Sequence, residues 1–322
     1  MTSEKKQITL SDLTNQDFWR ALNPDAHITD TPFIGMEAVE FSGEEQQSLV
    51  QHMAGDGYFQ TPSVLDVNEL TKLRNIVQTL YANGLLPLFA TVYDEFWQLV
   101  IKLRQCFKPV LGDAYRLTPD FWIFYIKQDI NAFGWTIHRD AIFNRETINE
   151  NGLPRLLTVW VPLTDVTTSD SCMYVVPRVY DEVYHKVRRG EMARSNDAML
   201  PIQLNQVRAL PVKAGEILGW DATLLHWGSA SSYWATSPRI SIGIYYESAD
   251  QNFYLSAKNY DSTRKYIEHD NLNSVISFEN RLRIVANNLN TYKHKFEKEG
   301  GAVEDNYSEV FQQFRDEWHW KT

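Results

Sequence analysis

The 322-residue sequence has little of what marks a membrane protein or a disulfide-stabilised protein. Its only cysteines, Cys106 and Cys172, form no CxxC pair, which argues against a disulfide framework and against a cysteine-based zinc site. No run of about 18 apolar residues is present to span a bilayer. The N-terminal MTSEKKQITLSDL contains no apolar signal segment. We therefore expect a cytoplasmic protein with reduced, buried thiols and no membrane partner.

Positive charge is also scarce. There are 31 Lys and Arg residues against 41 Asp and Glu, a formal net charge of −10, which disfavours nucleic acid as a partner. The 15 glycines and 12 prolines are too few for a collagenous or low-complexity chain. Aromatic residues, in contrast, make up 13% of the chain. This excess indicates either a stacked core or an aromatic-lined pocket.

The pattern along the chain predicts a single domain in three parts. Residues 1–120 form a helical wrap, 121–247 a β core, and 248–322 a helical C-terminal extension. Residues 1–40 show no sustained periodicity, whereas later apolar residues recur at helical spacing, most clearly after a capping Asp66. The predicted helices are 44–53, 66–83, 92–107, 276–300 and 308–318.

The β core is predicted from seven short runs rich in β-branched and aromatic residues. Runs of this kind, separated by turns, favour a sandwich or barrel. A polar insertion at 178–206 interrupts them and is long enough to be a functional flap. The predicted strands are 121–128, 134–140, 155–163, 172–177, 207–212, 216–220 and 238–247.

Three short motifs carry candidate chemistry. His138 and Asp140 are two residues apart, so a strand would place both on one face. His226 lies between Leu225 and Trp227, where an unpaired imidazole would be costly to bury. Taken singly, these residues could equally be a surface hydrogen-bonded pair and a satisfied core histidine.

The third motif is a strand on which Arg239 and Ser241 share a face. A guanidinium donates two parallel hydrogen bonds to a carboxylate, and the hydroxyl adds another. Alone, this arginine could form an internal salt bridge. Two histidines and one carboxylate on a β scaffold, however, form the facial triad of non-haem Fe(II) sites, and an arginine one strand further on can hold a co-substrate carboxylate.

With these residues in place, the sequence resembles the phytanoyl-CoA dioxygenase (PhyH)-like branch of the Fe(II)/2-oxoglutarate-dependent oxygenases. The likeness covers roughly 45–247. It includes the Asp-Gly-Tyr-Phe stretch at 56–59, the strand pair at 156–165 and 171–177, and the turn at 215–226. The resemblance implies a mainly β fold with flanking helices (α+β), built on a double-stranded β-helix or jelly roll.

The resemblance also implies residue roles. It makes His138, Asp140 and His226 the ligands of Fe(II), with 2-oxoglutarate and O2 as co-substrates. The carboxylate of 2-oxoglutarate is assigned to Arg239 and Ser241. Trp160 matches a family tryptophan near the co-substrate, and strand alternation gives Thr158 the same face.

The chain departs from the family at two places. Ser171 stands where the family commonly has glycine, and Pro177-Arg178-Val179-Tyr180 replaces a Pro-Gly-Ser-His sequence. Both lie at the entry to the insertion, so they affect the substrate side of the site and leave the metal side unchanged.

The implied function is a dioxygenase that hydroxylates an unactivated C–H bond of a small molecule, in the biosynthesis of a specialised alkaloid or amino-acid-derived metabolite. Related halogenases carry a small residue in place of Asp140, so hydroxylation or desaturation is expected. Acyl-CoA or a lipid is an alternative substrate. A zinc-dependent hydrolase would leave Arg239 unexplained, and a non-catalytic jelly-roll binding protein would leave the ligand set unexplained. The oligomeric state stays open, with a homodimer through the helical extensions as one form.

Other residues receive weaker interpretations. Basic residues of the insertion could form a lid over an anionic substrate or a solvated helix, and Tyr233 with Trp234 could form a substrate wall. The remaining histidines are not expected to be ligands, although His185 lies in the insertion. They are His27, His52, His185, His269, His294 and His319.

Overall fold

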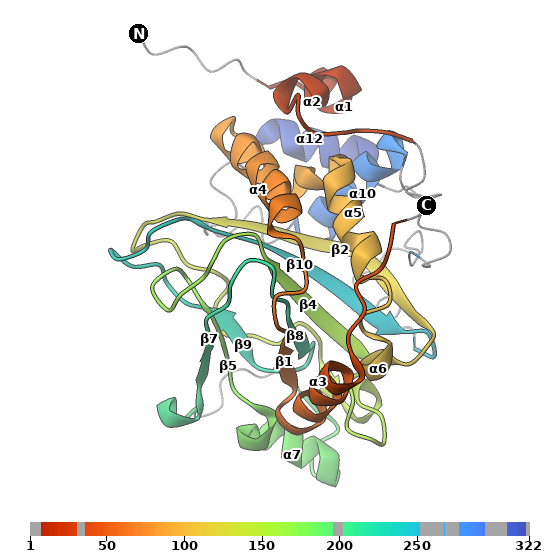
Figure 1. The fold of residues 1–322 in the computed structure, drawn as a ribbon, viewed down its shortest axis with the longest axis vertical. Helices are drawn as coiled ribbons and strands as arrows, with labels where there is room; N and C mark the ends of the chain where they lie inside the picture. The colour runs from red at the N-terminus through yellow and green to blue at the C-terminus, as the bar shows by residue number, and fades with distance from the viewer. Residues whose placement is uncertain are drawn as a thin grey trace.

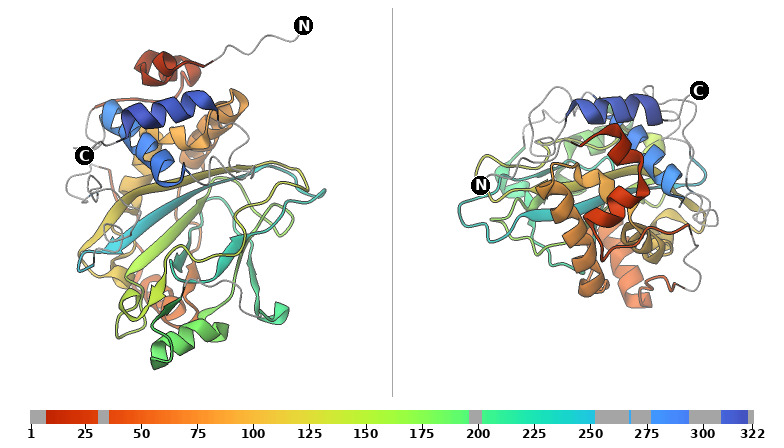
Figure 2. Two further views of the ribbon diagram at one scale, coloured as in Figure 1. Left: turned by 180° about the vertical axis from the view of Figure 1, so that it is seen from behind. Right: turned by 90° about the horizontal axis from the view of Figure 1, so that it is seen from above.

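The fold is described from a computed structural model that covers residues 8–30, 36–195, 202–251, 267, 277–293 and 308–319. Figures 1 and 2 show a long sheet with helices stacked over one face and a smaller sheet against the other. The helices are α1 (Leu10–Thr14), α2 (Gln16–Leu22), α3 (Gly43–Asp56), α4 (Val67–Ala82), α5 (Asp94–Leu103), α6 (Lys108–Leu111), α7 (Glu182–Arg189), α10 (Phe278–Thr291) and α12 (Glu309–Trp318). Short 3-10 helices are η1 (Pro87–Val92), η2 (Arg145–Thr147), η3 (Arg178–Tyr180) and η4 (Leu204–Gln206).

The larger sheet is antiparallel, in the order β1-β8-β4-β10-β2. Its central strands pair so that Gly243 lies opposite Trp122 on one side and Trp160 on the other. This register places three neighbouring strands around one glycine, and the pocket described below forms there. The strands are β1 (Tyr58–Gln60), β2 (Tyr115–Ile126), β4 (Leu156–Pro162), β8 (Leu218–Asp221) and β10 (Arg239–Ser248).

A three-stranded sheet in the order β7-β5-β9 faces the larger one, and a two-stranded ribbon pairs β3 with β6. A buried cluster joins residues of both larger sheets, including Trp160 and Trp220 from one and Val175 and Leu210 from the other. Two antiparallel sheets packed face to face form the expected jelly roll with flanking helices. The remaining strands are β3 (Phe143–Asn144), β5 (Met173–Val175), β6 (Arg194–Ser195), β7 (Arg208–Leu210) and β9 (His226–Gly228).

Helices α4, α5, α10 and α12 cover the outer face of the larger sheet (Figures 1 and 2). Phe96 and Trp97 of α5 meet Phe121 of β2 edge-on, with ring centroids 4.9 and 5.8 Å apart. Aromatic side chains bury large apolar areas, so these contacts contribute strongly to helix-to-sheet packing. The aromatic residues that follow helical spacing are therefore core residues.

Local sequence signals explain where α3 and α4 begin and end. Ser42 accepts from the Glu45 amide while the Glu45 side chain accepts from the Ser42 amide, a capping box. Helix α3 ends at Gly57, whose φ of 82° is left-handed and suits glycine. A Cβ at Gly57 would also lie 3.0 Å from Leu224 Cδ1, so this turn packs closely against the β core. Asp66 caps α4 as predicted.

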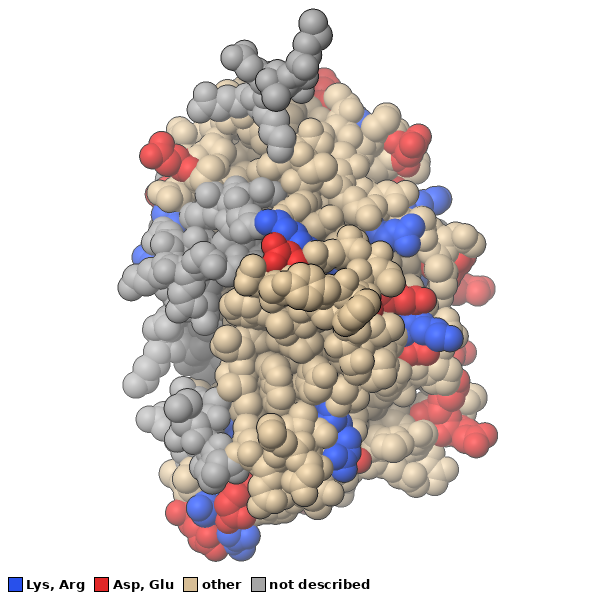
Figure 3. All heavy atoms as spheres, turned by 90° about the vertical axis from the view of Figure 1, so that its left-hand side faces the viewer, with Lys and Arg blue, Asp and Glu red and all other residues tan. Residues whose placement is uncertain are grey.

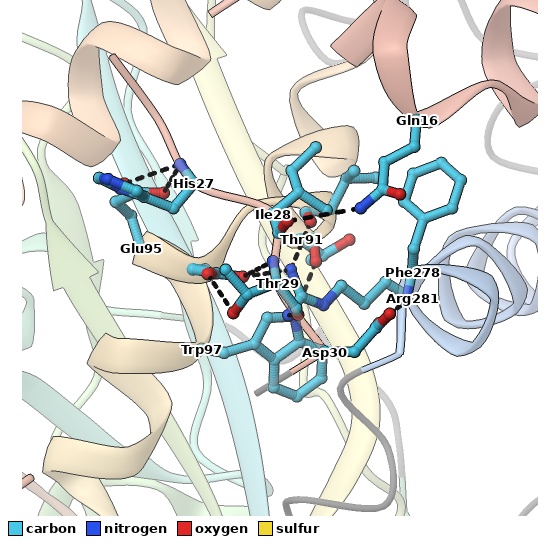
Figure 4. Close-up of polar contacts among 12 residues, drawn as sticks. Gln16, His27, Ile28, Thr29, Asp30, Thr91, Glu95, Trp97, Phe278 and Arg281 are labelled. Carbon is cyan, nitrogen blue, oxygen red and sulfur yellow. Dashed lines mark hydrogen bonds and ion pairs between the residues drawn. The ribbon is translucent and has the colours of Figure 1, made fainter. Parts of the chain in front are cut away.

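A buried arginine joins the N-terminal segment, α5 and α10 (Figure 4). Arg281 donates to Asp94 Oδ1 and the Val92 carbonyl, each over 2.7 Å, and to the Thr29 carbonyl over 2.9 Å. Asp94 also accepts from the Thr29 amide and hydroxyl, over 3.1 and 2.8 Å. The guanidinium and carboxylate thus satisfy one another inside the helical layer.

Several sequence predictions need correction. Residues 1–40 contain two short helices, α1 and α2, each held by a side-chain N-cap. The predicted strand at 134–140 is irregular backbone with an isolated bridge between His138 and His226. The predicted helix 92–107 is shorter in the structure, because α5 ends at Leu103 and a turn follows before the short α6. Residues 294–300 of a predicted helix lie outside the described residues.

The surface gives two further facts. None of the helices among the described residues is long and apolar enough to cross a membrane. The face turned to the viewer in Figure 3 carries few charged side chains at its centre, while acidic and basic groups lie around its edges. Among the described residues on this face, Lys and Arg do not gather into the kind of basic patch that binds polyanions.

Candidate metal centre and co-substrate pocket

Three predicted ligands meet inside the jelly roll. His138 Nε2 lies 3.3 Å from Asp140 Oδ1, and His226 Nε2 lies 3.5 Å from Asp140 Oδ2. One ligand atom from each residue lies within 4.8 Å of the other two. His138 and His226 exchange backbone hydrogen bonds, each of 3.0 Å, so the irregular HxD segment is fixed against β9.

Backbone contacts fix the tautomers of both histidines. Nδ1 of His138 lies 2.6 Å from the Thr136 carbonyl, and Nδ1 of His226 lies 2.9 Å from the Leu224 carbonyl. A carbonyl only accepts, so each Nδ1 carries the hydrogen and each Nε2 presents its lone pair to the shared centre. This donor set fits a divalent transition metal.

Asp140 is held as a carboxylate by its neighbours. Its Oδ2 accepts from Thr158 Oγ1 over 2.8 Å and from Trp220 Nε1 over 3.1 Å. Tyr245 adds a long contact of 3.5 Å to Oδ1. Burial alone would raise the pKa of Asp140. The positive charge that His226 or His138 carries when protonated, together with the hydrogen bond from Thr158, outweighs burial, so the pKa lies well below its usual range.

His226 is prepared to ligate in its neutral form. Burial lowers the pKa of His226 to about 4, although the attraction of Asp140 acts in the opposite direction. A neutral imidazole at neutral pH does not need to lose a proton before it binds a metal.

A pocket extends from the triad to Arg239. Aromatic rings from several strands form most of its wall. Its lining comprises Trp122, Phe124, Trp135, His138, Asp140, Thr158, Trp160, Met173, Trp220, His226, Gly228, Arg239, Gly243 and Tyr245.

Arg239 is buried at the far end of the pocket. Its Nη1 donates to the Ser171 carbonyl over 2.8 Å, and the guanidinium lies over the rings of Phe124 and Trp160 at 5.6 and 5.7 Å. Burial lowers the pKa of Arg239 to about 10. Among the described residues, no carboxylate lies within ion-pair distance of it, whereas the other buried arginines each have one. Those arginines are Arg139, Arg178, Arg281 and Arg315.

Several donors near Arg239 also lack partners. In the described part of the chain, Arg239 Nε, Trp160 Nε1 and Ser241 Oγ are buried and make no hydrogen bond. Buried polar groups are seldom left unpaired. The buried indole N–H of Trp160, beside a guanidinium that has no carboxylate partner among the described residues, fits an anionic ligand with oxygen acceptors.

Two glycines form a close backbone contact beside the guanidinium. A Cβ at Gly134 would lie 3.0 Å from Gly228 Cα and 3.1 Å from Arg239 Nη2. A Cβ at Gly228 would lie 3.0 Å from Arg239 Nη1. Any side chain at either position would displace Arg239, so the site requires glycine at both.

The structure gives most predicted site residues a place at this pocket. His138, Asp140, His226, Arg239 and Trp160 all line it. Thr158 also lines the pocket, and its hydroxyl donates to Asp140. Ser241 is fully buried on the Arg239 strand and is not part of the lining.

Sequence reasoning missed Trp122, Phe124, Gly134, Gly228 and Gly243. Alternation along 121–128 puts Trp122 and Phe124 on one face, but nothing in the sequence shows that this strand pairs with β10. The glycines belong to no recognised motif. Only the three-dimensional contact between two segments shows why they are needed.

The structure places the other residues considered in the sequence away from the pocket. Tyr233 and Trp234 are each 82% exposed and do not line the pocket, so they are not its wall. Arg178 pairs with buried Asp221 over 2.7 Å and donates to three backbone carbonyls, so it belongs to the fold and not to a lid. His185 Nε2 lies 3.0 Å from the Val179 carbonyl, away from the triad.

Ser171 explains one departure from the family pattern. Its φ of 60° lies in the left-handed region, where glycine is favoured. The serine hydroxyl donates to the Ser229 carbonyl over 2.6 Å, which helps to hold it there. Its own carbonyl accepts from Arg239, so this strained residue positions the guanidinium.

Comparison with known proteins supports these observations. Residues 89–233 match the family model of phytanoyl-CoA dioxygenase (PhyH). The matched segment contains the triad and ends before Arg239. No curated protein matches the chain.

Among solved structures, the epimerase SnoN in complex with Fe3+, alpha ketoglutarate and nogalamycin RO is similar at 18% identity and a TM-score of 0.51. The match covers 70% of this chain and 96% of SnoN. The apo form of ThoJ, a non-heme monooxygenase, is similar at 16% identity and a TM-score of 0.51, covering 68% of this chain and 83% of ThoJ. At these identities the similarity establishes the jelly-roll fold.

Proposed function

We propose that the chain is a PhyH-like, Fe(II)- and 2-oxoglutarate-dependent dioxygenase. One observation carries the proposal: a His-Asp-His triad and a buried arginine without a carboxylate partner, among the described residues, line the same pocket. A metal bound on one side by three protein ligands keeps open positions for a bidentate co-substrate and O2. The arginine supplies the charge that the far carboxylate of 2-oxoglutarate needs.

In this proposal, some pocket residues bind the metal and others orient its ligands. His138, Asp140 and His226 hold the metal, and Thr158 and Trp220 orient the carboxylate ligand through hydrogen bonds. Fe(II) with 2-oxoglutarate and O2 supplies the oxidising power to remove hydrogen from a C–H bond, as the co-substrate becomes succinate and CO2.

The other end of the pocket fixes the co-substrate. Arg239 and Ser241 take its distal carboxylate, and Trp160 Nε1 is a further buried donor close to the guanidinium. Gly243 leaves the inner face of β10 open between this clamp and the triad. The aromatic wall excludes water, which strengthens each charge interaction and protects reactive species from side reactions.

For the substrate, we propose a small molecule with an unactivated C–H bond, oxidised during the biosynthesis of an alkaloid or amino-acid-derived metabolite. The aromatic lining favours an apolar or π-rich skeleton. SnoN and ThoJ, which share the fold, are named as an epimerase and a monooxygenase, so the products must be examined for both outcomes. Retention of Asp140 supports hydroxylation or desaturation over halogenation.

The test is anaerobic addition of Fe(II) and 2-oxoglutarate to folded protein, followed by visible absorption. We expect the charge-transfer band of a chelated 2-oxo acid. His138→Ala should abolish the band, and His185→Ala, which removes a half-buried imidazole of α7 away from the triad, should retain it. Folded wild-type protein without the band would overturn the proposal. Candidate substrates can then be screened by coupled formation of succinate.

A further inference from the structure

A continuous row of aromatic rings leads from the metal centre to helix α10. The ring centroid of His138 lies 5.3 Å from that of Trp135. Trp135 lies 4.6 Å from Trp122, and Trp122 lies 4.5 Å from Tyr292 near the end of α10. Each step is a direct ring contact within the usual distance range of aromatic pairs. The row therefore connects a pocket wall to a residue outside the pocket.

The row ends at a buried carboxylate that the proposed reaction does not use. Tyr292 donates its hydroxyl hydrogen to Asp120 Oδ2 over 2.5 Å. Asp120 is 5% exposed, and an Asn288 amide in its favoured orientation donates to the other carboxylate oxygen over 3.0 Å. The phenol thus has a proton acceptor already within hydrogen-bond reach.

Indoles and phenols are the side chains most readily oxidised by one electron, and a phenol becomes strongly acidic when it loses an electron. A phenol bonded to a carboxylate can therefore give up its electron and proton together. The rate of electron transfer falls steeply as the gap between two rings widens. Transfer between rings in contact is therefore fast. Tyr292 is half-buried, so a small reductant in solution can reach it.

We propose that Trp135, Trp122 and Tyr292 form a relay that removes oxidising equivalents from the metal centre when O2 reacts without substrate. The inference rests on the proposed function, which supplies the oxidant. In each event the phenol of Tyr292 would lose one electron through Trp122 and Trp135 to the oxidant that Fe(II), 2-oxoglutarate and O2 would supply, and the phenol proton would move to Asp120 Oδ2. A one-electron reductant such as ascorbate then restores the phenol, and the proton returns from Asp120.

The relay protects the pocket. Without it, the oxidant would attack the aromatic residues that line the site, such as Trp160 and Tyr245. A purely structural row would pack α10 against β2 equally well with phenylalanine in place of tryptophan or tyrosine. Phenylalanine preserves the ring but is far harder to oxidise, so it separates the two roles.

The test uses the full chain with tyrosine deuterated on its ring, loaded anaerobically with Fe(II) and 2-oxoglutarate. One pulse of O2 is given without substrate, and samples are frozen at intervals for electron paramagnetic resonance. We expect a tyrosyl radical in the wild type. Tyr292→Phe should lose it. Tyr81→Phe should keep it, because Tyr81 stacks on Tyr125 instead.

Two further variants test the path. Trp135→Phe should lose the tyrosyl signal and gain oxygen insertion into pocket peptides, read by mass spectrometry. Asp120→Asn should lower the radical yield, because the proton acceptor is gone. Unfolding midpoints of the phenylalanine variants should match that of the wild type, because phenylalanine keeps the ring packing.

The outcomes separate the relay from the function. A protein that shows the charge-transfer band but no tyrosyl radical, or a radical that survives Tyr292→Phe, overturns the relay alone. A folded protein without the band overturns the proposed function, and the relay falls with it.

Discussion

Two buried arginines, one in the helical layer and one in the pocket, have opposite surroundings. Arg281 is fully buried and donates to Asp94 and to two backbone carbonyls. Arg239 is 3% exposed, donates to the Ser171 carbonyl, and has no carboxylate within ion-pair distance among the described residues. A buried cation that pairs with a carboxylate of the same chain stabilises the fold. A buried cation without such a carboxylate is suited to bind an anionic ligand.

The largest expected effect is on the free energy of unfolding, which should respond differently to replacement of Arg281 and of Arg239 by methionine. Arg281→Met leaves Asp94 buried without its cation, which should lower the free energy of unfolding by about 3–5 kcal/mol. Arg239→Met strands no carboxylate and removes a poorly solvated charge, so it should leave the free energy unchanged or raise it by up to about 4 kcal/mol. Urea unfolding followed by circular dichroism measures both. An equal loss of the free energy of unfolding in both variants would contradict the distinction between the two arginines.

A second prediction concerns the space between Arg239 and the triad. A Cβ at Gly243 would lie in ordinary contact with Trp122 Cβ, at 3.4 Å, and the two methyl groups of valine would extend further into the pocket, so Gly243→Val overfills it. Overfilling costs about 1–3 kcal/mol, equivalent to roughly 5–150-fold weaker binding of 2-oxoglutarate. Titration of the anaerobic charge-transfer band measures this loss, and metal affinity should be unchanged.

The control for Gly243→Val is Gly55→Ala in α3. A Cβ there meets nothing within 4 Å, so co-substrate binding should match the wild type. If Gly243→Val binds 2-oxoglutarate normally, the co-substrate does not pass along this face of β10.

A smaller effect, on metal affinity, is expected when the hydrogen bond that orients Asp140 is removed. Thr158→Val removes the donor to Asp140, and losing such a support should lower metal affinity by about 10–100-fold. Thr91→Val removes a comparable buried hydroxyl from the helical layer, where it donates to the Leu88 carbonyl. Competition with a metal chelator should show a loss for the first variant and none for the second.

Sequence reasoning was sufficient for the fold class and for the four charged or ligating residues that meet at the pocket, which are His138, Asp140, His226 and Arg239. Arg239 and Ser241 could be placed on one face because alternation in an isolated strand is a local property. The helix caps at Ser42 and Asp66 are local for the same reason. These features depend on a few neighbouring residues, so a single sequence displays them.

The rest depends on contacts between distant segments. Neither glycine of the pair at 134 and 228 shows its role until the two backbones are seen beside Arg239. The HxD segment was predicted as a strand, yet hydrogen bonds to β9 hold it as irregular backbone. Arg178 looked like part of a basic lid because its buried partner, Asp221, lies 43 residues away in sequence. Pairing of this kind is not encoded by local spacing.

The central claim is that Arg239 binds the distal carboxylate of the co-substrate. The direct measurement compares 2-oxoglutarate with 2-oxopentanoate, which has a methyl group in place of that carboxylate, by anaerobic titration of the Fe(II) protein. Losing one partner of a buried charged pair costs about 2–5 kcal/mol, so the wild type should prefer 2-oxoglutarate by about 30-fold or more. In Arg239→Met this preference should disappear while 2-oxopentanoate binding is retained. An equal preference in the wild type and Arg239→Met would contradict the account.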